Sequence, residues 1–293
     1  MPQKIFVSDV TITDTTIPKL RDDALLSDGS LFLFDPSHSL GGFSGIPTSG
    51  TVPNVAWKEA ALVLGSGTQS TLAASMLNAS ADTANVWKTE RTSAGGIHGI
   101  VTQAGGQTIG KSWYAKAPQA VADYLRTNAS THQFYFSIWK TITRPTVAAG
   151  NVAPQSHFNM LFDTSNFLFH FSNGFATPSA AGSIGTTLVP NAADSAVAVG
   201  TPKFASVGTN NKNGTLNPGQ GVTFGVGTFD AFDAYNWNKA PSVILYRLYI
   251  EDLTASGRSY ATVQALDQAL YTAAFASGGR FYNDTYTNPS TLP

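Results

Sequence analysis

The amino-acid sequence predicts a mainly β protein, folded as a two-sheet antiparallel β-sandwich with a C-terminal helix and an extended N-terminal arm. Charged residues make up only 12% of the chain, which also contains 27 glycines and 15 prolines. Ser, Thr and Asn therefore carry most of the polar surface, which is typical of short strands joined by many turns. Several short runs alternate between apolar and polar residues, as strands with one buried face do. With 293 residues the chain can bury the core of one large β domain.

The first thirty residues are expected to form an assembly arm. Ile5 and Val7 alternate with polar residues, but Pro18 breaks the pattern and a charged run follows it. A segment that buries little apolar surface on its own tends to order against a partner. The alternative is an ordinary first strand of the sandwich. We therefore divide the chain into an arm, residues 1–30, and a β-sandwich domain with loop insertions, residues 31–293.

Strands are expected at residues 133–139 and 222–226, and a hairpin at 157–172, because apolar residues alternate there with a period of two. A short apolar run predicts a further strand at 31–34, and another strand is expected at 203–207. Helices are expected at 70–78 and 118–128. The predicted core consists of large apolar residues from these strands and from the last strand: Phe134, Phe136, Ile138, Phe158, Met160, Phe162, Leu245 and Tyr249.

The segment 242–279 combines a long strand, an acidic pair, an expected turn at residues 254–258 and a helix. The strand, 243–250, is apolar on both faces and interrupted only by Arg247, so we expect it to be buried on both sides of a sheet. Ser259 suits the N-cap of a helix near 259–276, and Gly278 suits the left-handed position beyond its end. This ending resembles that of laminin-G-like and concanavalin-A-like jelly rolls, and the resemblance implies that fold.

The sequence carries no clear catalytic signature. The resemblance includes glucanases that place two glutamates on one strand, because retaining hydrolysis needs two carboxyls about 5 Å apart. Here Glu59, Glu90 and Glu251 are far apart in the chain. Glu251 and its neighbour Asp252 should point to opposite faces and close the last strand, with Arg258 as a partner. Two aspartates from distant strands remain an open alternative. The five histidines show no zinc-ligand spacing.

One aromatic stretch is a candidate ligand site. Its rings alternate with polar residues in a predicted loop, as sugar-contacting rings do, and its aspartates offer oxygen ligands for calcium. The other interpretation is that the rings pack beneath the loop and that the aspartates only favour turns. The candidate sugar contacts are Phe229, Phe232, Tyr235 and Trp237, and the candidate calcium ligands are Asp230 and Asp233. No other cofactor is expected.

Composition also bears on partners and location. The formal net charge is −1 and there is no basic cluster, so nucleic acid is not an expected partner. There are no cysteines, and no apolar run approaches the roughly 20 residues of a membrane span. The first residues lack the apolar centre of a signal peptide, which favours synthesis in the cytoplasm without export.

The strand-to-helix ending ILYRLYIEDLTASGRSYATVQALDQALY, in a charge-poor chain without cysteine, resembles virion proteins of tailed bacteriophages. The resemblance implies a non-enzymatic structural component of a phage particle: a fibre, spike, decoration, baseplate or tail protein. Other virion proteins, copies of the same chain and a host surface glycan are the implied partners, and the virion is the implied location. The alternative is a lectin or a carbohydrate-active enzyme of concanavalin-like fold.

Overall fold

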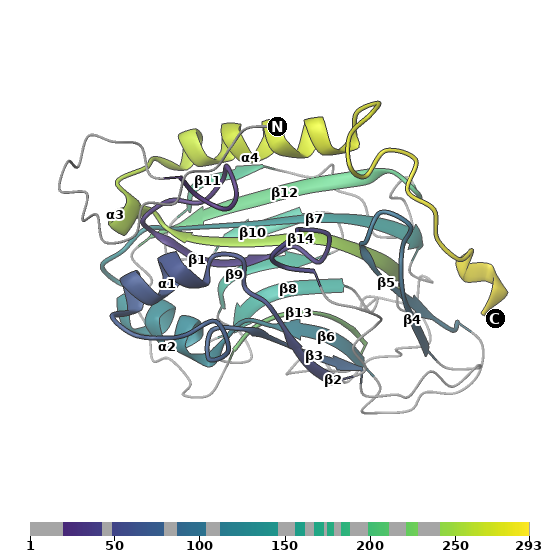
Figure 1. Ribbon diagram of the computed structural model, residues 1–293, viewed down its shortest axis with the longest axis horizontal. Coiled ribbons are helices and arrows are strands. Elements are labelled where there is room, and N and C mark those ends of the chain that lie inside the picture. Colours follow the sequence, from purple (N-terminus) through teal and green to yellow (C-terminus); the bar gives the residue numbers. More distant parts are fainter. Residues whose placement is uncertain are drawn as a thin grey trace, which may run out of the picture.

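The computed structural model describes residues 20–42, 49–78, 87–103, 112–145, 156–161, 167–172, 175–178, 183–187, 199–210, 221–227 and 241–292. Within these ranges the chain forms two antiparallel β-sheets that pack face to face, with helices at the periphery (Figure 1). The prediction of a mainly β, two-sheet sandwich is therefore confirmed.

Sheet A is built around the last strand of the chain. Its members are β1 (Ser30–Phe34), β4 (Trp87–Arg91), β5 (Ile97–Val101), β7 (Phe134–Arg144), β11 (Ser183–Thr187), β12 (Pro202–Thr209) and β14 (Ser242–Asp252). The order is β11-β12-β7-β14-β5-β4, and β1 also pairs with β14. β14 thus pairs with β7 along one edge and with β5 and β1 along the other. All of its residues are buried, which confirms the prediction of a strand buried on both faces.

Sheet B is the layer of shorter strands on the other side of the core. Its members are β2 (Ser49–Val52), β3 (Ala74–Asn78), β6 (Ser112–Lys116), β8 (Ser156–Leu161), β9 (Phe167–Ser172), β10 (Phe175–Pro178) and β13 (Val222–Gly227). The order is β10-β9-β8-β13-β6-β3-β2. β8 and β9 pair in antiparallel register, so the predicted hairpin at 157–172 is confirmed in its two strands.

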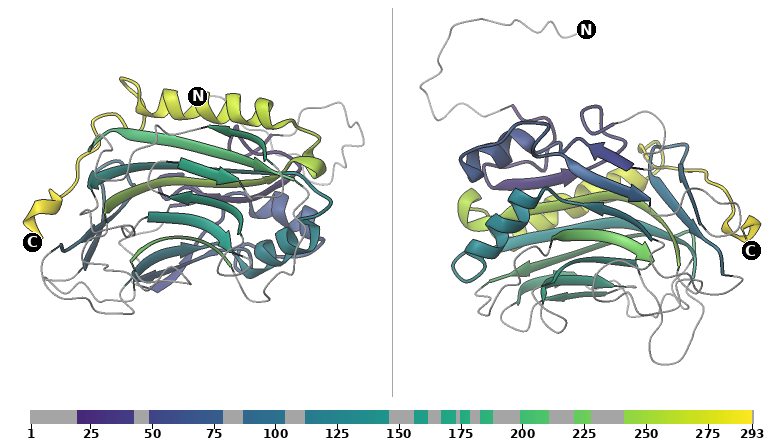
Figure 2. Two further views of the ribbon diagram at one scale, coloured as in Figure 1. Left: turned by 180° about the vertical axis from the view of Figure 1, so that it is seen from behind. Right: turned by 90° about the horizontal axis from the view of Figure 1, so that it is seen from below.

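The main core lies between the two sheets, whose layers Figure 2 shows from behind and from below. Phe134, Phe136 and Ile138 of β7 point into it at every second position, as their alternation predicts. The ring of Phe136 stacks on that of Phe169 from sheet B, with 3.8 Å between centroids. Each such buried ring contributes roughly 1.5–3 kcal/mol of transfer free energy. Of the predicted core residues, Phe162 lies outside the described residues, and six of the others are buried between the sheets. The prediction was wrong for Tyr249, which is buried in a separate cluster on the outer face of sheet A.

Four helices cover the ends and one side of the sandwich in the described part of the chain. They are α1 (Trp57–Leu64), α2 (Gln119–Asn128), α3 (Leu253–Ser256) and α4 (Tyr260–Phe275). Figure 1 shows α4 along the side of sheet A near β11 and β12, with α1 and α2 together at one end. The predicted helix at 118–128 is confirmed as α2, and that at 259–276 as α4, where the Ser259 side chain accepts a hydrogen bond from the Thr262 backbone N–H.

Two local predictions were wrong. The helix expected at 70–78 is absent, because residues 74–78 form β3 and pair with both β2 and β6. The expected turn after Asp252 is instead the short helix α3, capped by that aspartate and ended by Gly257 in the left-handed conformation. Gly278 does have the expected positive φ, 81°, three residues after the end of α4.

The described part of the predicted arm belongs to the packed domain. Leu25 and Leu26 are buried, and they join Leu33, Tyr249 and Val263 in a second apolar cluster on the outer face of sheet A. Residues 1–19 lie outside the described residues. The assembly-arm prediction therefore remains a prediction for residues 1–19.

Candidate functional site

The candidate site lies on the outer face of sheet A, where a β-bulge in β14 positions an arginine. Leu245 pairs with Lys140 and Arg247 pairs with Trp139, so Tyr246 is the extra residue of the bulge. Leu245 and Leu248 belong to the core between the sheets, whereas Tyr246 packs in a cluster on the outer face. The extra residue shifts the alternation of side chains along the strand. As a result Arg247 points outward with Tyr246 instead of into the sandwich.

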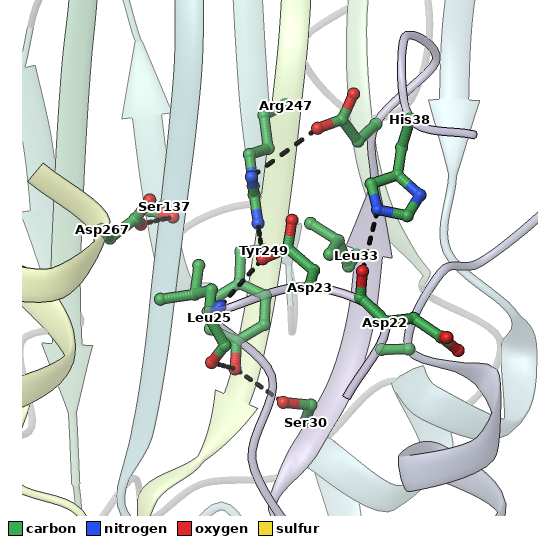
Figure 3. A network of polar contacts seen from close by, with 12 residues as sticks. Asp22, Asp23, Leu25, Ser30, Leu33, His38, Ser137, Arg247, Tyr249 and Asp267 are labelled. Carbon is green, nitrogen blue, oxygen red and sulfur yellow. Dashed lines mark hydrogen bonds and ion pairs between the residues drawn. The ribbon is translucent and has the colours of Figure 1, made fainter. Parts of the chain in front are cut away.

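Arg247 connects two aspartates from the N-terminal part of the chain (Figure 3). Its guanidinium is 2.7 Å from an Asp23 oxygen and 3.6 Å from an Asp35 oxygen. Asp35 also accepts a 2.6 Å hydrogen bond from Arg280, which follows α4. The Arg247 guanidinium lies 4.8 Å from the centroid of the Trp139 ring, a cation–π distance. We call Asp23, Asp35, Arg247 and Arg280 the outer-face network.

The charges of this network stabilise one another in a buried setting. Burial alone would raise the pKa of Asp23, but the adjacent Arg247 charge lowers it below the ordinary value. Burial alone would likewise lower the pKa of Arg247, and the two aspartates raise it. Both groups therefore stay ionised at neutral pH. Removing one member would leave the others charged and buried, which is the costly case for a buried ion pair.

A fully buried carboxylate of α4, Asp267, binds the neighbouring surface of β7. It accepts hydrogen bonds from the Tyr135 hydroxyl at 2.9 Å, the Ser137 hydroxyl at 2.5 Å and the Trp139 indole N–H at 3.0 Å. These donors are alternate residues of one strand, so all three point to the outer face. Burial raises the pKa of Asp267, against the opposing effects of the Arg247 charge and the three hydrogen bonds.

The acidic pair after β14 is also engaged inside the protein. Glu251 accepts hydrogen bonds from Ser27, Tyr249 and the expected partner Arg258, the first two at 2.8 Å. The expected pairing of Glu251 with Arg258 is therefore present. Tyr249 also bonds the Ser30 hydroxyl at 2.7 Å (Figure 3), so that this cluster ties the N-terminal segment to β14.

The Asp252 side chain points to the opposite face of the sheet from that of Glu251, as the alternation along the strand predicts. Its Oδ2 lies 2.7 Å from the Tyr124 hydroxyl on α2 and 2.6 Å from Nδ1 of His132. Its Oδ1 accepts the backbone N–H of Ala255 and so caps α3. Each oxygen of the Asp252 carboxylate is therefore bonded to another residue of the same chain.

A third acidic group fastens the C-terminal segment to the edge of sheet A. Glu90 of β4 accepts the Thr287 backbone N–H at 2.7 Å and the Thr287 hydroxyl at 2.5 Å. Its other neighbour is the buried imidazole of His98, whose Nδ1 is 2.9 Å away. Burial alone would raise the pKa of Glu90, but the hydrogen bonds from His98 and Thr287 lower it to about 2. Burial lowers the pKa of His98, which favours its neutral form.

A pocket of about 320 Å³ adjoins the outer-face network and is lined by Asp23, Trp139, Arg247 and Arg280, together with apolar residues of α4.

Hydrolysis by paired carboxylates needs an accessible proton donor with a raised pKa beside a second carboxylate. Asp23 is held ionised by Arg247, and Asp267, the acid with a raised pKa, is fully buried. The arrangement is suited to ionic cross-linking of segments that are distant in sequence.

The sequence-predicted ligand residues Phe229, Asp230, Phe232, Asp233, Tyr235 and Trp237 all lie outside the described residues. Within the described ranges no cluster of three His, Asp or Glu side chains is placed to hold a metal ion. None of the described helices has the length and hydropathy needed to cross a bilayer. Sequence reasoning did not single out Asp23, Asp35, Asp267 or Arg280. For Asp267 a signal existed, because it follows Val263 by four positions and precedes Leu270 by three, on the apolar face of the helix.

Comparison of the chain with protein-family models, with curated proteins and with solved structures gives no match. The function must therefore be inferred from the residues of this chain alone.

Proposed function

We propose that the protein is a non-enzymatic structural component of a tailed-phage particle, built on a concanavalin-A-like jelly roll. The observation that carries the proposal is the use of the buried carboxylates. Asp35, Asp252, Asp267 and Glu251 are each fully buried and bonded to partners of the same chain. They hold the N-terminal segment, α2, α4 and the C-terminal segment against sheet A. Such use of acidic groups suits a structural shell or fibre component more than a catalyst.

Two further features support this assignment. The pair of seven-stranded antiparallel sheets in the described part of the chain is the architecture that the jelly-roll resemblance implies. The strand-to-helix ending on which the resemblance rests is realised in β14, α3 and α4. A fibre, spike, decoration, baseplate or tail position would each use such a module, in copies that associate with one another and with other virion proteins.

The test is the composition of purified particles from a host that expresses this gene. We expect quantitative mass spectrometry to find the chain at a fixed number of copies per particle, and an electron-microscopy map to contain the two-sheet sandwich. A chain that stays in the supernatant when particles are purified in a density gradient would contradict the proposal.

Residues 1–19 provide a second test, of the assembly arm. Deleting residues 2–19 leaves the packed residues 20–30 in place, including buried Leu25 and Leu26. We expect a soluble domain with an unchanged melting temperature that no longer enters particles. A truncated protein that melts much lower would show that the segment belongs to the sandwich core instead.

The rival function is carbohydrate-active catalysis in a concanavalin-like fold. The adjacent carboxylates Glu251 and Asp252 would be its candidate catalytic pair, but both are already bonded within the fold, Glu251 to Arg258 and Asp252 to Tyr124. We expect no release of reducing sugar from host polysaccharide by the purified protein. Release that is abolished in Glu251→Gln or Asp252→Asn variants of unchanged melting temperature would favour the enzyme.

A further inference from the structure

A second pocket lies between the end of α4, the sheet and the C-terminal segment, and we call it the tail pocket. It has a volume of about 290 Å³. Its main walls are Tyr246, Phe275, Phe281, Tyr282, Asp284 and Tyr286. This volume is near the lower end of ligand pockets, which run from about 300 to 1,000 Å³.

The walls of the tail pocket are fixed by the fold. Asp284 accepts the Ser93 hydroxyl at 3.0 Å and the Ala94 backbone N–H at 2.8 Å, and its second oxygen accepts the Tyr246 hydroxyl at 3.0 Å. The Phe281 backbone N–H donates to the Ala274 carbonyl oxygen at the end of α4. A ligand would therefore meet a pre-formed surface and would not bear the entropic cost of ordering a loop.

Two features of the rim point toward a ligand. Asn283 has a φ of 54°, and of the described residues it is the only non-glycine with a positive φ. Such a conformation, although milder for Asn than for most residues, is common at binding sites. Beside it Tyr282 is 48% exposed, so a ligand can reach its ring from solvent. The rim thus presents an amide and an aromatic face to solvent.

The chemistry of the pocket favours a neutral, polyhydroxylated ring over an ion. Rings offer flat apolar surfaces, while Asp284, Asn283 and the Tyr286 phenol offer hydrogen-bonding groups of both kinds. Burial and the Asp284 charge raise the pKa of Tyr286, so its phenol stays protonated and able to donate. A cation is less well served, because three hydrogen bonds already engage the Asp284 carboxylate and Arg280 already stacks on Phe281, 4.5 Å from its centroid. About one of the roughly four lone-pair sites of Asp284 is left, which is enough to accept one hydroxyl.

We propose that the tail pocket binds one pyranose unit of a glycan, with an apolar sugar face on Tyr282 and hydroxyl groups at Asn283, Asp284 and Tyr286. This inference rests on the pocket alone. It goes beyond the proposed particle role and would hold equally for a protein that never enters a virion.

The test is ligand-observed NMR, by saturation transfer, with the full chain and a panel of methyl glycosides of glucose, galactose, mannose, N-acetylglucosamine and N-acetylgalactosamine. We expect at least one glycoside to bind in the millimolar range or tighter. Tyr282→Ala should weaken that binding at least tenfold, and Tyr286→Phe should weaken it several-fold by removing one hydroxyl. Leu62→Ala on α1 is the matched control, because it also removes an exposed apolar side chain, one that is 75% exposed.

The folded state of each variant is checked by its melting temperature. If Tyr282→Ala melts lower than the parent, Tyr282→Ser takes its place. Binding by no glycoside of the panel would overturn the proposal, as would binding that Tyr282→Ala and Leu62→Ala leave equally intact. A last arm uses tetramethylammonium and Nα-acetyl-lysine amide. Saturation transfer to these cations, without transfer to any glycoside, would show an aromatic cage for cationic side chains and would also overturn the proposal.

Discussion

The two faces of sheet A are both buried, but by different physical means. The inner face packs against sheet B through aromatic and aliphatic side chains such as Phe136 and Leu248. The outer face is covered by α4 and by the segment before β1, and charged or hydroxyl groups such as Arg247 and Asp267 lie between the layers. Sheet A therefore binds its neighbouring sheet through apolar packing and binds irregular segments through polar contacts.

The difference shows that burial of apolar area stabilises the contact between large regular surfaces. Short segments have little apolar area to bury, so directional hydrogen bonds and ion pairs fix their position instead. Hydrophobic burial is non-directional and proportional to area. A segment such as residues 20–30 contributes only a few apolar side chains, so its position is fixed by ion pairs and hydrogen bonds. Buried charges add specificity only while every partner is present. We therefore expect the outer face to be the more sensitive to pH and to the loss of single charges.

The largest expected effect is on the inner face. Phe136→Ala removes a ring that stacks on Phe169 and leaves a cavity between the sheets. We expect a loss of about 3–5 kcal/mol in the free energy of unfolding, with little dependence on pH. Urea denaturation at several pH values measures it, with Leu62→Ala as a control expected within about 0.5 kcal/mol of the parent. A cost below about 1 kcal/mol would mean that the two sheets do not pack as described.

The next largest effect tests the outer-face network. Arg247→Met keeps the volume of the side chain over Trp139 but leaves Asp23 and Asp35 without their shared cation. We expect a loss of about 3 kcal/mol. Lys58→Met is the matched control, because its ion pair with Asp22 is exposed and should contribute no more than about 1 kcal/mol.

A double-mutant cycle sharpens this result. Asp23→Asn in the Arg247→Met background should recover part of the lost stability, because it removes the charge that has lost its cation, whereas Asp35 keeps its ion pair with Arg280. Equal losses for Arg247→Met and Lys58→Met, or additive effects of the two buried substitutions, would contradict the idea that the outer face depends on buried charge.

A smaller effect is expected for Asp267→Asn, which removes one acceptor for the donors on β7. We expect a loss of about 2 kcal/mol near pH 4. Because burial raises the pKa of Asp267 above 3.8, its contribution is complete below pH 3.8 and is lost as the pH rises through the folded-state pKa. The deficit of the variant should therefore shrink toward neutral pH. A deficit that grows with pH, in urea titrations from acid to neutral, would mean that the pKa is lowered instead.

The smallest effect, about 1 kcal/mol at neutral pH, is expected for Glu90→Gln at the partly exposed edge. The pKa of Glu90 is lowered from 4.5 to about 2, so its contribution is present above pH 4.5 and is lost as the pH falls toward 2. The deficit of the variant should vanish in acid, which is the opposite trend to Asp267→Asn. Melting temperatures recorded from pH 2 to 7 test this, and parallel curves for parent and variant would refute it.

The inner face was predictable from sequence because its signal is local. The alternation of Phe134, Phe136 and Ile138 is legible in five consecutive residues, and Ser259 marks the start of α4 by itself. The wrong helix at 70–78 arose because Ala, Met and Leu favour helices in isolation, whereas pairing with two neighbouring strands decides the structure. The helix α1 was overlooked although its sequence, WKEAALVL, consists mostly of good helix formers.

The outer-face network could not be predicted in the same way. Asp23 and Arg247 are 224 positions apart, and no local pattern relates them. The bulge at Tyr246 also shifts the alternation of β14, so a strict period of two places Arg247 on the wrong face. The candidate ligand residues at 229–237 lie outside the described residues and remain a prediction.

The central place of β14 has a consequence for the order in which the molecule can be made. All strands of sheet B end by Gly227, whereas sheet A gains its central strand only when residues 242–252 have left the ribosome. Until then β1 and β5 have no partner in β14, and β7 lacks one neighbour. Non-local pairing of this kind is slow, and unpaired strand edges are prone to aggregation. We expect a chain released after residue 241 to protect sheet B from protease while β1 stays sensitive, because the first strand of the protein depends on pairing with the last.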